Sequence, residues 1–157
     1  LIIPGSAILV AFFDFIMGLL IFVVLCIIYK QSISWQAVLY FPAGIIIVLL
    51  AAFGIGTFLA ALNVKFRDFR YTIPFLLQVL FFASQIIYPL FSIQQQWLKY
   101  LLAINPMNAA IELFRSPLSG TSPDFAVIGI GVLSTLLFFA MGIFYFRKTE
   151  SYFADLS

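Results

Sequence analysis

Long apolar runs separated by short polar stretches dominate the chain. The four runs cover residues 7–29, 37–62, 73–93 and 125–146. Each of them exceeds the roughly 20 residues that a helix needs to cross a hydrocarbon core about 30 Å thick. We therefore expect an all-α integral membrane protein, a single transmembrane domain over residues 1–157 with four transmembrane helices.

The segment 94–124, between the third and fourth runs, is neither a span nor a plain loop. Its apolar stretch 97–104 is too short to cross a membrane. Asn105 is then placed to cap a second short helix, with Pro106 as its first residue. We expect that helix to end near Arg115. The pattern predicts a helical hairpin that lies in, or dips into, the membrane surface.

Polar residues interrupt the third run at helical spacing. Gln78 and Gln85 are seven positions apart, with Phe82 between them and Tyr88 beyond, so one helix face would carry all four. Aromatic faces and amides suit the C–H faces and hydroxyl edges of a sugar, which favours a translocation path. Amides also form hydrogen bonds between membrane helices, and the spacing does not separate the two hypotheses.

The second run carries a repeat of small residues. Ala52, Gly56 and Ala60 are four positions apart, and small residues at this spacing let another helix approach closely in lipid. Ordinary helix packing is the favoured interpretation of the repeat.

Composition makes the bilayer the only suitable solvent. The chain is 64% hydrophobic and 9% charged, with a mean hydropathy of +1.17, whereas soluble domains carry about 25% charged residues. There is no His and a single cysteine, Cys26, which excludes an intrachain disulfide and a Cys/His metal site. We find no catalytic constellation and expect neither catalytic residues nor a bound metal.

Asp14 is the one acidic residue inside a predicted span. It could be a proton or cation site, or a carboxylate near the cytoplasmic end that a neighbouring helix or water satisfies. The second interpretation is favoured, because the spans hold neither a His nor a second carboxylate for a relay.

Basic residues set the predicted orientation. Five lie in the turn 63–72 and the tail 147–157, and three lie in the loops 30–36 and 94–124 or at their edges. Lys and Arg near span ends are retained in the cytoplasm, so we place the turn, the tail and the N-terminal end inside. The turn could also contact a cytoplasmic partner or anionic lipid.

Motifs along almost the whole chain resemble those of ABC-transporter permeases that export polysaccharides and polyol phosphates, the group of O-antigen, capsule and teichoic-acid exporters. The set and its order carry the resemblance more than any single motif. The matching segments are 60–71, 73–78, 86–89, Trp97, 101–107, 112–115 and 145–155.

The resemblance implies that these are the last four of six spans, with upstream spans absent from the sequence. It implies a homodimer in a bacterial or archaeal cytoplasmic (inner) membrane that passes a lipid-linked glycan, with no nucleic acid partner. ATP and Mg²⁺ would bind a separate ATPase subunit, and this chain would hold no cofactor. The implied periplasmic gate comprises Trp97, Asn105, Pro106, Glu112 and Arg115, in which Glu112 and Arg115 are spaced to pair. The implied cytoplasmic loop includes Lys65, Arg67, Asp68 and Arg70.

Three other functions stay open at this point. An ABC permease for a drug or small lipid would share the six-span plan. An ion-coupled transporter would depend on Asp14, and a non-transporting membrane scaffold would have no ATPase partner.

Overall fold

A computed structural model describes residues 2–66, 68–88 and 92–154, and these residues contain helices and no strand. The all-α prediction is therefore confirmed for this part of the chain. The helices are α1 (Ile2–Ile28), α2 (Ala37–Lys65), α3 (Phe69–Phe82), α4 (Gln96–Ala103), α5 (Pro106–Ser119) and α6 (Phe125–Ala154).

Among the described residues, three helices are long and apolar enough to cross a membrane. The candidate spans are Gly5–Ile28, Ala37–Lys65 and Phe125–Thr149, and they correspond to the first, second and fourth predicted runs. The tail was expected to leave the helix after residue 146, but α6 continues to Ala154. No Gly or Pro interrupts it after Gly142.

The third run differs from its prediction as a continuous helix over 73–93. Helix α3 has 14 residues and ends at Phe82, which gives a length of about 21 Å at ~1.5 Å per residue. The chain leaves the helix because Gln85, which is fully buried, bonds to Asn108 of α5. Its backbone N–H donates to Oδ1 of Asn108 at 2.7 Å, where a helix would use the carbonyl four residues earlier. Pro89, the expected site of a bend, lies outside the described residues.

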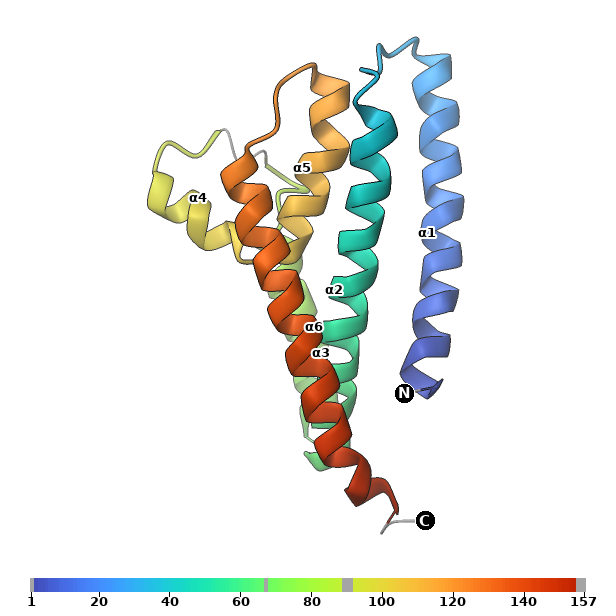
Figure 1. Ribbon diagram of the computed structural model, residues 1–157, viewed down its shortest axis with the longest axis vertical. Helices are drawn as coiled ribbons and strands as arrows, with labels where there is room; N and C mark the ends of the chain where they lie inside the picture. The colour runs from blue at the N-terminus through green and yellow to red at the C-terminus, as the bar shows by residue number, and fades with distance from the viewer. Residues whose placement is uncertain (1, 67, 89–91, 155–157) are drawn as a thin grey trace.

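The loops group at the two ends of the bundle as the orientation analysis predicts. The N–H of Ser34 donates to the carbonyl of Pro117 at 3.0 Å, and Nε2 of Gln31 donates to the carbonyl of Leu118 at 3.0 Å. The α1–α2 loop and the end of α5 therefore share one end. The α2–α3 turn and both termini lie toward the other (Figure 1).

Helices α2 and α6 make the closest approach in the bundle. Gly54 of α2 packs against the backbone of Phe139, and Gly142 of α6 packs against the carbonyl of Gly54. The buried hydroxyl of Thr57 is satisfied within its own helix, by the carbonyl of Phe53 at 2.7 Å. Gly54 and Gly142, which make this contact, are not members of the predicted repeat at residues 52, 56 and 60. The residues of that repeat are only half-buried.

Helix α5 lies against both α2 and α6 (Figure 1). Ala109, Ala110 and Leu113 form a buried cluster with Ile47 of α2. We call α4 and α5 together the hairpin. Its second helix is thus part of the bundle core. It also passes Arg115, its predicted end, and stops at Ser119.

Helix α5 ends where Gly120 adopts a φ of 66°. This left-handed conformation is the usual C-terminal stop of a helix and suits glycine. The helix runs past its expected end near Arg115 because Pro117 is accommodated inside it.

Candidate functional site at the end of α3

Gln85 and Asn108 join the end of α3 to α5. The backbone N–H of Gln85 donates to Oδ1 of Asn108, and Nε2 of Gln85 donates to the carbonyl of Asn108 at 2.5 Å. Nδ2 of Asn108 donates in turn to the carbonyls of Ala83 at 3.1 Å and Leu102 at 2.7 Å. Both residues are fully buried. Asn108 thus satisfies backbone groups that the break in the helix leaves without helical partners.

Asn105 and Arg115 extend this network on either side. Oδ1 of Asn105 accepts from the N–H of Met107 at 3.1 Å, and Nδ2 donates to the carbonyl of Leu80 at 3.1 Å. Nη2 of Arg115 donates to the carbonyl of Gln85 at 3.1 Å. The predicted roles of Asn105 as N-cap and Pro106 as first helical residue are confirmed.

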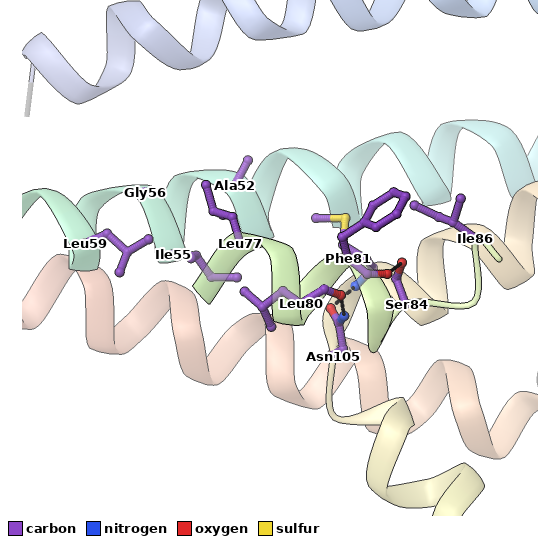
Figure 2. A pocket seen from close by; sticks show the side chains of 11 residues that line it. Ala52, Ile55, Gly56, Leu59, Leu77, Leu80, Phe81, Ser84, Ile86 and Asn105 are labelled. Carbon is purple, nitrogen blue, oxygen red and sulfur yellow. Dashed lines mark hydrogen bonds between the residues drawn. The ribbon is translucent and has the colours of Figure 1, made fainter. Parts of the chain in front are cut away.

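An apolar cavity lies between α2, α3 and the start of α5 (Figure 2). Its volume is about 460 Å³. Ala52 and Gly56 of α2 face Leu77 and Phe81 of α3 across it, and Asn105 closes one end with its bond to α3. A second apolar cavity, of about 450 Å³, lies between α2, α3 and residues of α4 and α6. The two cavities suit hydrocarbon better than a hydroxylated ligand.

An ion pair joins the hairpin to the beginning of α6. Nζ of Lys99 in α4 donates to Oδ2 of Asp124. Oδ1 of Asp124 accepts from the backbone N–H groups of Ala126 at 3.0 Å and Val127 at 3.4 Å, which caps α6. The hydrogen bond from Lys99 is the main cause that lowers the pKa of Asp124 below 3.8, with the backbone bonds adding to it and burial opposing it.

The predicted four-residue stripe does not form one face, because α3 ends between its members. Gln78 and Phe82 lie on α3 and are exposed. Gln85 is buried against α5, and the hydroxyl of Tyr88 donates to the carbonyl of Phe82 at 3.0 Å. The prediction that Gln78 and Gln85 share a helix face is therefore wrong. The contacts of Gln85 match the helix-to-helix alternative.

The remaining hairpin residues have separate environments. Trp97 is 66% exposed at the start of α4. Glu112 and Arg115 were expected to pair, but Oε1 of Glu112 accepts from the N–H of Asp124 at 3.4 Å while Arg115 bonds to Gln85. The two charged side chains thus bond to different segments, Glu112 to the residue before α6 and Arg115 to the turn after α3.

The basic turn lies at the other end of α3. Lys65 ends α2, with Nζ 5.4 Å from the ring centroid of Phe66. Asp68 and Arg70 line a polar hollow of about 630 Å³ with Asn63 and Tyr71. Arg67 lies outside the described residues. Asp14 is exposed on α1, far along the sequence from this turn.

Asn108 is the site residue that sequence reasoning missed. It lies in the first turn of α5, three positions after the N-cap Asn105, and the amides of both donate to carbonyls at the end of α3. An asparagine in the first turn of an apolar helix could have indicated a buried acceptor and donor. Its partner could not have been inferred, because Gln85 lies 23 residues away in a turn.

The long apolar helices and the hairpin folded into their core define a multi-pass membrane protein. The chain belongs to the ABC-2 type transporter family, which matches residues 2–119. It is therefore a membrane permease domain of this family, a class of domain that lacks ATPase activity.

A curated relative is the O-antigen export system permease protein RfbA of Myxococcus xanthus. The two are 32% identical over 155 residues, which cover 95% of this chain and 58% of the relative. The chain thus spans a little over half of that protein's length. No solved structure matches the chain significantly.

Proposed function

We propose that the chain is part of the permease subunit of an ABC exporter for a lipid-linked polysaccharide of the O-antigen, capsule or teichoic-acid type. The observation that carries this proposal is the 32% identity to an O-antigen export permease over 95% of the chain. The permease would act in the cytoplasmic membrane of a bacterium or archaeon. ATP and Mg²⁺ would bind the separate ATPase subunit.

The dimensions of the chain support a homodimer. The two apolar cavities beside α3 hold about 460 and 450 Å³. Neither suits a hydroxyl-rich polymer, which needs a longer path with polar groups. A second copy would supply the other wall, and the exposed Gln78 and Phe82 on α3 are the candidates for contact with the glycan.

The orientation supports contact with the ATPase at the basic turn. The turn follows Lys65 and holds Asp68 and Arg70 at a polar hollow, at the end of the bundle opposite the hairpin (Figure 1). Clustered basic residues next to span ends favour the cytoplasmic side. The hairpin would then face the periplasm, where the gate role of Trp97, Glu112 and Arg115 remains a proposal.

The test uses the full-length permease assembled with its ATPase in lipid vesicles. We expect lipid-linked glycan to raise the rate of ATP hydrolysis and to appear inside the vesicles. A drug or small lipid that stimulates hydrolysis in place of the glycan would replace the proposed cargo. Loss of glycan export in Asp14→Asn would favour ion coupling.

A further inference from the structure

The sides of α3 are weakly attached to the rest of the chain. No residue of α3 is fully buried. The cavities of about 460 and 450 Å³ lie along α3, and α2 lines both of them, with residues of α4 and α6 also lining the second. Apolar contacts beside a void lose part of their dispersion energy, so displacement of α3 relative to α2 breaks few favourable contacts.

The end of α3 is strongly attached to the hairpin. Five hydrogen bonds join residues 80–85 to residues 105–115. Asn108 takes part in three of them, more than either Asn105 or Arg115. A displacement of the end of α3 relative to α5 would leave several buried donors and acceptors unpaired, which is costly away from water.

We infer that Asn108 is a positioning residue that anchors the end of α3 to α5, which is itself packed against α2, so that α3 tilts relative to α2 while its end stays fixed on α5. The α3 helix begins directly after the basic turn and ends at this network. A displacement of the turn would therefore tilt α3 about this anchor. This inference rests on the proposed contact between the ATPase and the basic turn.

The test measures distances in the full-length permease assembled with its ATPase. Spin labels are attached to introduced cysteines after Cys26, the one native cysteine, is changed to Ser. Phe81→Cys with Met107→Cys reports on α3 and α5, and Ala52→Cys with Leu77→Cys reports on α2 and α3. All four positions line the same cavity.

Addition of ATP with vanadate should change the α2–α3 distance and leave the α3–α5 distance constant. A change in the α3–α5 distance, or no change in either pair, would overturn the inference. In Asn108→Ala, the distribution of α3–α5 distances should broaden and become dependent on nucleotide. If Asn108→Ala keeps a narrow distribution that nucleotide does not change, Asn108 does not join the helices.

Ser119→Ala is the matched control on α5, since its hydroxyl bonds to Arg115, Ser116 and Thr121 but not to α3. It should leave both distances as in the parent. If Asn108→Ala fails to assemble, Arg115→Ala removes only the bond to Gln85 and should broaden the α3–α5 distance to a smaller extent. An unchanged distance in that variant would contradict the inference.

The experiment contains no glycan, so its outcome is independent of the cargo. Nucleotide-dependent movement without glycan-stimulated hydrolysis would refute the proposed cargo and leave the role of Asn108 in place. Glycan export with independent movement of α3 and α5 would refute the role of Asn108 alone.

Discussion

Gly54 of α2 and Phe139 of α6 are in backbone contact. A Cβ on Gly54 would lie 2.6 Å from the Cα of Phe139, closer than Cβ atoms approach atoms of other helices in real structures. Backbone contact of this kind is how membrane helices gain packing energy when lipid offers no hydrophobic drive for their association.

Gly54→Ala should therefore destabilise the α2–α6 pair by about 1–3 kcal/mol, as overpacking does elsewhere. The measurement is thermal unfolding of the purified permease in detergent. Gly56→Ala is the matched control on the same helix, because its Cβ would meet only Cδ1 of Ile8 at 3.9 Å. Equal melting temperatures for the two variants would contradict the close approach.

Gly131 of α6 makes the corresponding contact with α5. A Cβ there would overlap Ala109, whereas a Cβ on Gly129 would meet nothing within 4 Å. Gly131→Ala should separate α5 from α6 and increase proteolysis of the hairpin, while Gly129→Ala should leave the digestion pattern unchanged. A digestion pattern of Gly131→Ala that matches the parent would show that α5 does not need this contact.

The charge on Asp124 should stabilise the folded protein at neutral pH. Its pKa is lowered in the folded state, chiefly by the hydrogen bond from Lys99. The stabilisation is therefore fully present above the ordinary value of 3.8 and is lost as the pH falls through the lower folded pKa. Asp124→Asn, which keeps a capping side chain, should lower stability by about 0.2–1 kcal/mol at pH 7.

The difference in unfolding temperature between parent and Asp124→Asn should shrink below pH 3.8. Lys99→Met should show the same pH dependence, because it removes the other partner. A difference that stays constant down to the lowest accessible pH would show that the ion pair does not contribute.

Loss of the Asn105 side chain should weaken both the start of α5 and its link to α3. Asn105→Ala removes the cap on Met107 and the bond to Leu80, and loss of an N-cap alone costs about 0.5–2 kcal/mol. Hydrogen exchange should increase over residues 80–85 as well as at the start of α5. Faster exchange at the start of α5 alone would indicate a local cap without the link to α3.

Gln85 and Gln78 should respond differently to replacement by Leu. Gln85→Leu removes a buried amide that bonds to Asn108, so the amount of folded complex should fall together with export. Gln78 is exposed on α3, and Gln78→Leu should lower glycan export at an unchanged amount of complex. Loss of export without loss of complex in Gln85→Leu would return Gln85 to the translocation path.

The sequence by itself determined the helical class, three of the spans and the boundaries that local chemistry sets. Runs of more than 20 apolar residues can satisfy their backbone in lipid only as helices. Asn105 and Pro106 define the start of α5 because an N-cap and a first-turn proline act within a few residues. The grouping of loops at the two ends followed from counting spans and basic residues.

Only the tertiary structure decided where α3 ends and what its polar residues do. The periodic pattern of Gln78 and Gln85 assumed a helix that continues, but Gln85 bonds to Asn108 and does not extend α3. The small residues that pack against another helix were equally hidden, since Gly54 and Gly56 differ only in the direction they face. Such choices depend on partners far along the chain, and local pattern carries no record of them.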